Sequence, residues 1–156
     1  MPVDDEFVYI ITYGLAGAVC KVLGKEKADS IFRLAGEREF GELKKKVDIS
    51  ETEPVAVLNK IARWFEKTGY LQRQEIKRTS ENEIIVDTYG VSEGYYAASS
   101  KLRQEGAESP HYWTFMAIAS LEKRCDLNVR SESLSTPAMR EERTSHLRDR
   151  LLSSEV

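Results

Sequence analysis

The stretch that decides the fold is residues 50–89, SETEPVAVLNKIARWFEKTGYLQRQEIKRTSENEIIVDTY. Its first part predicts an amphipathic helix, because apolar residues recur at spacings of three and four and so form one stripe. Pro54 suits the first helical turn, and either Thr52 or Glu53 can cap the helix. Gly69 can adopt the left-handed conformation that ends helices. The stripe consists of Val57, Leu58, Ile61, Trp64 and Phe65.

The second part of the same stretch predicts a β-hairpin. Residues 70–77 and 83–89 contain the β-branched and aromatic residues that favour strands, and the polar residues 78–82 separate the two runs. A helix that is followed directly by a hairpin can bury its apolar stripe against the sheet. We therefore expect the rest of the chain to pack against this helix and hairpin.

The whole chain has 156 residues, a formal net charge of −3, and acidic and basic residues that are mixed along its length. This length suits a single domain with its own core. The charge balance argues against nonspecific binding of nucleic acid. The two cysteines, Cys20 and Cys125, predict free thiols in a cytoplasmic protein, and the acidic residues 4–6 are unlike a secretory signal.

Residues 7–23 are apolar on nearly all sides and predict a helix that ends at Gly24. The run is shorter than the about 20 residues of a membrane span, and Lys21 interrupts it, so we expect no span. A helix of this kind lies either in the core of its own chain or against a second subunit. Both interpretations are open.

The next helix, predicted at residues 25–47, contains two glycines, Gly36 and Gly41. Each costs up to about 1 kcal/mol of helix stability relative to alanine, so two of them predict a packing or functional reason. The reason is either close contact with another helix or a wall of a ligand site. We expect a homodimer that forms through residues 7–23 or through the face with Gly36 and Gly41.

The remaining residues predict shorter elements and a charged end. Residues 137–156 predict a peripheral helix or tail outside the main domain, which is expected to span residues 1–136. The order of elements predicts an α+β fold with an antiparallel sheet, built on a central hairpin and packed against long helices. The shorter elements are a helix at 91–98, a loop at 101–106, a helix that runs from the cap Ser109-Pro110 to Lys123, and a strand at 127–134.

The sequence contains no catalytic signature that we can identify. A G-x-S-x-G nucleophile motif is absent, and neither His111 nor His146 has a partner at a spacing typical of metal ligands. Cys125 follows the basic pair Lys123-Arg124, which favours a lowered thiol pKa. We therefore expect a protein that is not an enzyme and that needs no metal or other cofactor.

Two segments resemble the vinyl-reductase-like family of small-molecule-binding domains, which is related to Golgi transport-particle subunits. Residues 31–41, IFRLAGEREFG, are similar to a helix of that family with an Ala-Gly pair and a later glycine. Residues 64–70, WFEKTGY, are similar to its helix end before the first strand, and residues 111–121 and 127–132 follow in matching order. The resemblance implies an α+β fold that dimerises and holds a small apolar ligand as a sensor or carrier.

A ligand site in such a fold is expected between the 31–47 helix, the hairpin and the helix that begins at His111. Large aromatic side chains near these elements either wall a cavity or fill the core completely. The alternative function is a winged-helix transcriptional regulator that binds DNA, because a helix followed by a hairpin also ends that fold. The candidate ligand-binding residues are Gly36, Trp64, Tyr95, Tyr96, His111, Trp113 and Phe115.

Overall fold

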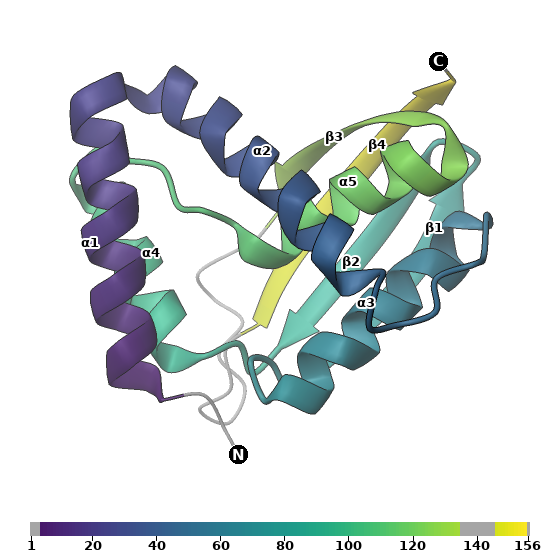
Figure 1. Cartoon of the computed structure of the whole chain (residues 1–156), viewed down its shortest axis with the longest axis horizontal. Coiled ribbons are helices and arrows are strands. Elements are labelled where there is room, and N and C mark those ends of the chain that lie inside the picture. The colour runs from purple at the N-terminus through teal and green to yellow at the C-terminus, as the bar shows by residue number, and fades with distance from the viewer. Residues whose placement is uncertain (1–3, 135–145, 156) are drawn as a thin grey trace.

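The structure is a computed structural model of the chain, and it describes residues 4–134 and 146–155. It has the expected α+β architecture, in which helices pack against an antiparallel four-stranded sheet (Figure 1). The elements in chain order are α1 (Asp5–Leu23), α2 (Lys25–Leu43), α3 (Pro54–Thr68), β1 (Arg73–Ser80), β2 (Glu83–Tyr89), α4 (Glu93–Gln104), α5 (Tyr112–Cys125), β3 (Leu127–Ser133) and β4 (His146–Glu155).

Helix α3 and the β1–β2 hairpin form as the sequence predicts. The Glu53 carboxylate accepts hydrogen bonds from the backbone N–H groups of Val55 and Ala56, which caps the helix. Gly69 ends it in the left-handed conformation, with φ of 78°. The predicted turn at 78–82 is too long, because β1 continues to Ser80 and the strands pair up to the turn.

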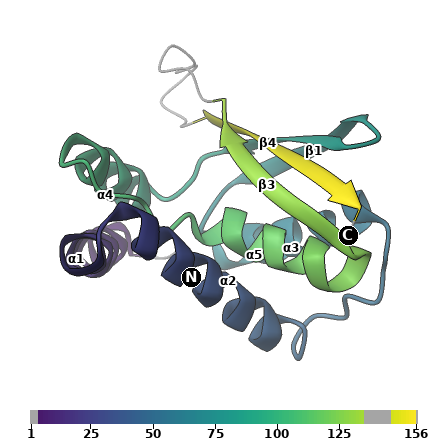
Figure 2. The ribbon, with the colours of Figure 1, turned by 90° about the horizontal axis from the view of Figure 1, so that it is seen from above.

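The sheet has the strand order β1-β2-β4-β3, and every neighbouring pair is antiparallel. Helices α2, α3 and α5 lie on one side of it, as Figure 2 shows from above. Helix α5 contacts α2, α3 and β3, so the core is built around this helix. Its residues from Trp113 to Leu121 are all buried.

Strand β4 corrects the expectation of a peripheral helix or tail at 137–156, which is wrong for residues 146–155. The strand lies between β2 and β3, where Leu151 is buried opposite Ile84. Ion pairs join it to both neighbours, since Arg150 contacts Glu83 on β2 and Glu132 on β3. These partners are distant in sequence, and therefore no local pattern reveals the strand. The other part of the predicted helix, 137–145, lies outside the described residues.

The part of the chain from α4 to the start of α5, which lies between β2 and β3 in sequence, also differs from expectation. The predicted loop at 101–106 belongs largely to α4, which continues to Gln104. Ser109 does not cap α5, which begins at Tyr112 after His111. The Ser109 hydroxyl is instead buried, 2.8 Å from the Tyr95 hydroxyl, so a tertiary contact replaces the expected cap.

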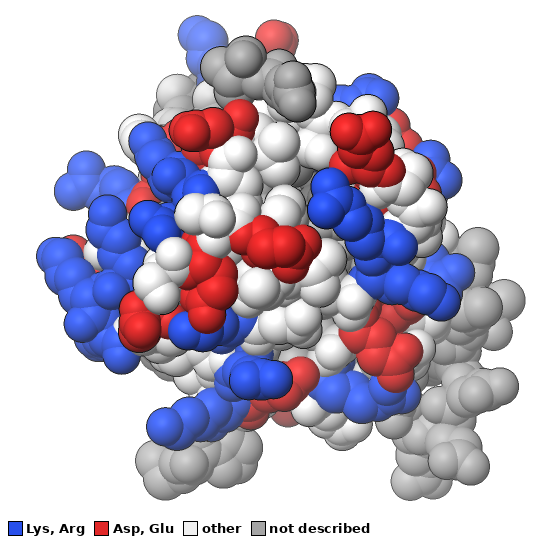
Figure 3. All heavy atoms as spheres, turned by 90° about the vertical axis from the view of Figure 1, so that its right-hand side faces the viewer, with Lys and Arg blue, Asp and Glu red and all other residues white. Residues whose placement is uncertain are grey.

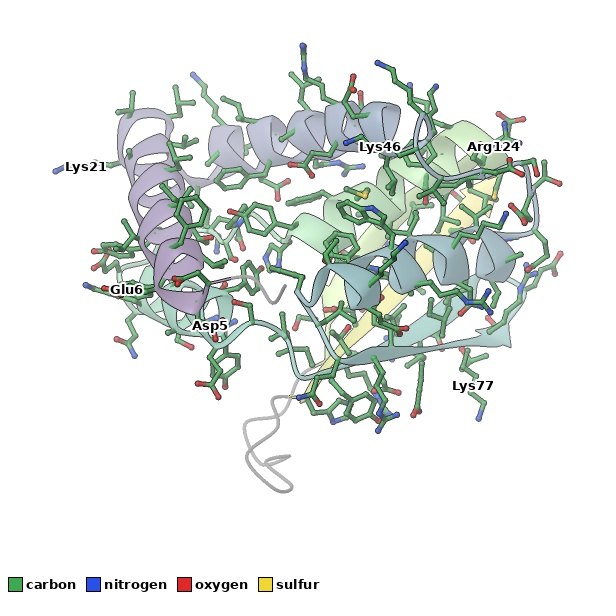
Figure 4. The ribbon with its side chains drawn as sticks, turned by 60° about the horizontal axis from the view of Figure 1, so that its bottom comes forward. Asp5, Glu6, Lys21, Lys46, Lys77 and Arg124 are labelled. Carbon is green, nitrogen blue, oxygen red and sulfur yellow. The ribbon has the colours of Figure 1, made fainter. Side chains whose placement is uncertain are left out.

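Helices α1 and α4 form a pair that stands away from the sheet (Figure 1). Asp5, at the N-terminal end of α1 in Figure 4, accepts a hydrogen bond from the Ser92 hydroxyl at 2.6 Å. A Cβ at Gly94 would lie 1.8 Å from the Asp5 carbonyl oxygen, so only glycine permits this approach. The starts of the two helices are therefore tightly joined.

Helix α1 buries only one narrow face, made by Val8, Thr12, Ala16 and Cys20. With 19 residues and a mean hydropathy of 1.5, it is long and apolar enough to cross a membrane, by length and composition alone. Its outer face is apolar and exposed, so the helix is not buried within its own chain as one of the two interpretations expected. The exposed large apolar residues of α1 and α2 are Phe7, Ile10, Ile11, Leu15, Val22, Leu23, Ile31 and Leu34.

The architecture does not support the winged-helix alternative. That fold is a compact three-helix domain with a wing, whereas here four antiparallel strands are backed by long helices. Acidic and basic side chains are also intermixed on the face seen in Figure 3, which includes no continuous basic surface. The described surface in this view therefore lacks the electrostatic pattern typical of a DNA-binding site.

Candidate functional site

An open groove of about 480 Å³ lies between α2, α3 and α5. Its volume falls in the range of about 300–1,000 Å³ typical of small-molecule sites. Most of its wall is apolar, and charged side chains from α2 and the turn after it stand at its rim, including Lys46 at the end of that segment in Figure 4. The lining residues are Arg38, Glu39, Glu42, Leu43, Lys46, Trp64, Phe65, Tyr112 and Met116.

The aromatic wall of the groove comes from the end of α3. Trp64 and Phe65 pack edge to face, with ring centroids 5.1 Å apart. Phe65 is buried in the core, whereas Trp64 is only partly buried and presents its indole to the groove. Tyr112 and Met116 complete the wall from α5, because residues four apart lie on the same face of a helix.

Glu39 is a partly buried carboxylate in this wall. Burial raises its pKa above the ordinary value, because desolvation disfavours the charged form. No hydrogen bond or ion pair to Glu39 occurs among the described residues. Its neighbour on the rim, Glu42, is different, since Lys45 lies 2.7 Å from its carboxylate and holds its pKa below the ordinary value.

Tyr112, which lines the groove, belongs to a cluster of three tyrosine rings with Tyr70 and Tyr95. The ring of Tyr70 is 5.7 Å from that of Tyr95 and 6.1 Å from that of Tyr112. Burial raises the pKa of Tyr70 well above its ordinary value, and the neighbouring tyrosines and Glu39 raise it further. The Tyr112 hydroxyl lies 2.9 Å from the Thr12 hydroxyl. These phenols therefore stay protonated and neutral at physiological pH.

A second concave region, which we call the polar hollow, has a volume of about 280 Å³. It uses a different side of α5 from the groove, with Thr114 and Ile118 in place of Tyr112 and Met116. Phe115 of α5 also lines it. The other lining residues come from α2, the loop before α5, β3 and β4, and they are Asp29, Arg33, Glu108, His111, Arg130, Ser131, Ser133 and Asp149.

Most charges of the polar hollow are paired within the protein. His111 Nε2 lies 2.9 Å from Glu108 Oε1, and this contact holds the pKa of Glu108 below its ordinary value. Arg33 pairs with Glu122 at 3.2 Å. Two carboxylates of the hollow, Asp29 and Asp149, have no such ion pair among the described residues, and burial raises the pKa of Asp149 to about 6 although the charge of His111 opposes the shift. The hollow is thus polar and largely self-satisfied.

The seven candidate residues do not converge on one site. Trp64 lines the groove, whereas His111 and Phe115 line the polar hollow. Gly36 does not open space, because a Cβ there would lie 2.6 Å from the backbone carbonyl carbon of Phe115. Its role is the close packing of α2 on α5. The other three, Tyr95, Tyr96 and Trp113, are buried or partly buried away from the groove lining, and their role in binding stays a prediction.

The site residues predicted from the sequence do not include Glu39, Tyr112 or Met116. Tyr112 and Met116 carry a usable signal, since their spacing of four puts them on one helix face. Glu39 carries none, because a glutamate on an exposed helix face looks the same in sequence as one that faces a groove. Only the packing of α3 and α5 against α2 distinguishes it.

The cysteines do not form a reactive or metal-binding centre among the described residues. Cys20 is buried on α1, and its thiol lies 3.6 Å from the carbonyl oxygen of Glu108. Burial raises the pKa of Cys125 and outweighs the lowering by the charge of Arg124, so the net shift is opposite to the expected one. The described part of the chain contains no group of three or more His, Cys, Asp or Glu side chains placed to hold a metal ion.

The chain matches no protein-family model, and no curated protein matches its sequence. Several solved structures share its fold at low identity. An H-NOX structure from work on heme distortion has a TM-score of 0.60 and 14% identity, covering 100% of this chain and 76% of that chain. A single-substitution variant of *T. tengcongensis* H-NOX also has a TM-score of 0.60, with 12% identity over 99% of this chain and 76% of that one.

A third structure, from work on the mechanism of H-NOX activation, has a TM-score of 0.58 and 13% identity, covering 99% of this chain and 76% of that chain. At such identities the similarity concerns the fold alone. H-NOX domains and vinyl-reductase-like domains share an α+β fold, so the similarity agrees with the expected architecture without selecting one of the two families. The chain has an H-NOX-like α+β fold.

Proposed function

We propose that this chain is a non-catalytic sensor or carrier domain that binds a small, largely apolar ligand in the groove between α2, α3 and α5. The groove itself carries the proposal, because about 480 Å³ bounded mainly by Leu43, Trp64, Phe65 and Met116 is a concave, mostly apolar space of the size that small-molecule sites have. The mostly apolar wall is the part of the groove that supports binding of a small ligand.

Heme is the ligand that one of the similar structures names, and the residues here do not fit it. Heme iron is held in proteins by histidine, by a cysteine thiolate, by tyrosine, or by methionine together with histidine, so Met116 alone does not complete a heme site. Neither described histidine lines the groove: His111 is paired with Glu108, and His146 lies 2.8 Å from Asp87. Tyr112 does line it, but burial raises the pKa of its phenol and so disfavours the phenolate that binds iron.

The binding test uses the two tryptophans as separate reporters. Trp113→Phe leaves Trp64 as the sole tryptophan, at the groove, and Trp64→Phe leaves Trp113, which is buried in the core. Bromooctanol, a neutral apolar alcohol whose bromine quenches indole fluorescence on contact, is titrated into both variants. We expect saturable quenching in Trp113→Phe and little in Trp64→Phe. Quenching of neither, or of both equally, contradicts the proposed ligand site.

We also propose that two copies of the chain pair through the outer face of α1. Three side chains on this face are largely exposed, with Phe7 at 62%, Leu15 at 64% and Val22 at 79%. Contiguous apolar patches of this kind on soluble proteins usually mark an interaction surface. The outer face of α1 is favoured over the alternative face with Gly36 and Gly41, because α5 of the same chain already covers Gly36.

Sedimentation of the full chain at micromolar concentration tests this dimer. We expect the wild type to sediment as a dimer and Leu15→Lys to sediment as a monomer, because a buried lysine in the interface is costly. Ile31→Lys is the matched control, since Ile31 is an exposed apolar residue of α2 that lies outside α1. A wild type that stays monomeric, or a Leu15→Lys variant that still dimerises, contradicts the assignment.

A further inference from the structure

One charged group distinguishes the groove from a simple apolar cavity. Glu39 projects from α2 into the same space as Trp64, Tyr112 and Met116. It is partly buried and has no hydrogen-bond or ion-pair partner among the described residues, and it raises the pKa of Tyr70, which places its carboxylate near that phenol. A carboxylate in such a place gains from any cation that enters the groove, because the site is partly shielded from water.

The cations of the protein itself do not fill this role. Arg38 and Lys46 also line the groove, but both side chains are exposed, and neither pairs with Glu39. The other acid of the rim, Glu42, is already paired with Lys45. Among the described residues, Glu39 is therefore the groove-lining carboxylate that has space beside it and no hydrogen-bond or ion-pair partner.

The aromatic wall suits the same kind of ligand. Indole and phenol faces attract cations, and this attraction is larger where water is partly excluded. Trp64 and Tyr112 both line the groove with Glu39. An ammonium group near these rings would be bound by the carboxylate and the π-faces together, while a ligand carboxylate would be repelled by Glu39.

We propose that the groove binds a protonated primary amine on an apolar chain or ring, with the ammonium group at Glu39 and the apolar part against Trp64, Phe65 and Met116. This inference rests on the proposed function and narrows it, because it names the chemical class of the ligand. A neutral ligand would shield the Glu39 carboxylate further from water without pairing with it. An anionic ligand would place two like charges together.

Competition among three ligands of equal chain length tests the proposal. Octylamine, octanol and octanoate are each used to displace bromooctanol from the Trp113→Phe protein, at neutral pH where octylamine is charged. We expect octylamine to bind at least about tenfold more tightly than octanol, which corresponds to one charge-assisted contact, and octanoate to bind most weakly.

Two variants separate the role of Glu39 from general charge effects. Glu39→Gln keeps the shape of the side chain and removes its charge, so we expect it to abolish the preference for octylamine over octanol. Glu42→Gln removes a charge from the same rim, where Glu42 is exposed and paired, and should leave the preference unchanged. Circular dichroism and urea unfolding check that both variants keep the wild-type fold.

The outcomes distinguish this inference from the proposed function. If octanol or octanoate displaces the probe as well as octylamine does in the unaltered groove, the amine assignment is overturned while apolar binding stands. An amine preference that survives Glu39→Gln, or that Glu42→Gln removes, overturns the role of Glu39. If bromooctanol itself does not quench Trp64, the apolar site and the amine assignment both fail.

Discussion

The groove and the polar hollow use different sides of α5 and differ in how they treat charge. In the polar hollow, Glu108 pairs with His111 and Arg33 pairs with Glu122, so most charges have partners inside the protein. In the groove, aromatic and apolar walls surround Glu39, which has no described partner. The comparison teaches that a gathering of titratable residues is not by itself a ligand site. A cavity that contains a polar group without a partner is the stronger indication of a ligand site.

The packing of α2 on α5 separates the two regions, and changing it should have the largest effect. Gly36→Ala places a Cβ 2.6 Å from the carbonyl carbon of Phe115, a backbone atom that cannot move aside freely. We expect a loss of about 3 kcal/mol in the free energy of unfolding, measured by urea denaturation.

Gly41→Ala is the matched control for that change, because it makes the same substitution in the same helix. A Cβ at Gly41 would have no heavy atom within 4 Å. Alanine there should stabilise the protein by about 0.5–1 kcal/mol through its higher helix propensity. Equal effects of the two substitutions would show that the α2–α5 contact is looser than described.

Substituting Asp149 tests whether the polar hollow contains a charge that has no stabilising partner in the folded protein. Its folded-state pKa of about 6 lies above the unfolded value, so its protonated form favours folding. That contribution is fully present below about pH 4 and is lost as the pH rises through 6. Asp149→Asn should therefore match the wild type at pH 4 and exceed its unfolding free energy by about 1–2 kcal/mol at pH 8.

Asp87, on the neighbouring strand β2, provides a control whose pKa shift has the opposite sign. Burial pushes the pKa of Asp87 upward, but hydrogen bonds from Arg148 and His146 outweigh burial and hold it below the ordinary value. Its charged form therefore stabilises the fold above the unfolded pKa, and this contribution is lost as the pH falls through the lower folded pKa. Asp87→Asn should lower stability at pH 8, and a gain there would contradict the described network.

The smallest effect is expected for Glu39→Gln in the protein without ligand. Removing an unpaired, partly buried charge should raise the free energy of unfolding by about 0.5 kcal/mol at neutral pH, since solvent screens much of the penalty. Chemical denaturation of the variant and of Glu42→Gln side by side measures this. A clear loss of stability in Glu39→Gln would mean that Glu39 already has a stabilising partner, which would weaken the contrast between the two regions.

Some parts of the candidate site can be predicted from the sequence, and others cannot. The position of Trp64 beside the groove follows from the stripe on α3, whose period is local. The environment of Glu39 does not, because it depends on α5 and on Trp64 and Phe65 of α3, which are more than twenty positions away. The sequence leaves the role of Gly36 open between close packing and a ligand wall, because a glycine permits either, and only the tertiary structure selects the contact with Phe115.

What the sequence determines by itself is the set of local elements. The cap at Glu53, the end at Gly69 and the β-branched residues of β2 are short-range signals, and the structure agrees with them. Only the tertiary structure decides the role of residues 146–155, whose charged pattern becomes a central strand because Arg148 and Arg150 meet acids on neighbouring strands. Local backbone preferences are read from neighbouring residues, whereas pairing partners and hollows arise from contacts between distant ones.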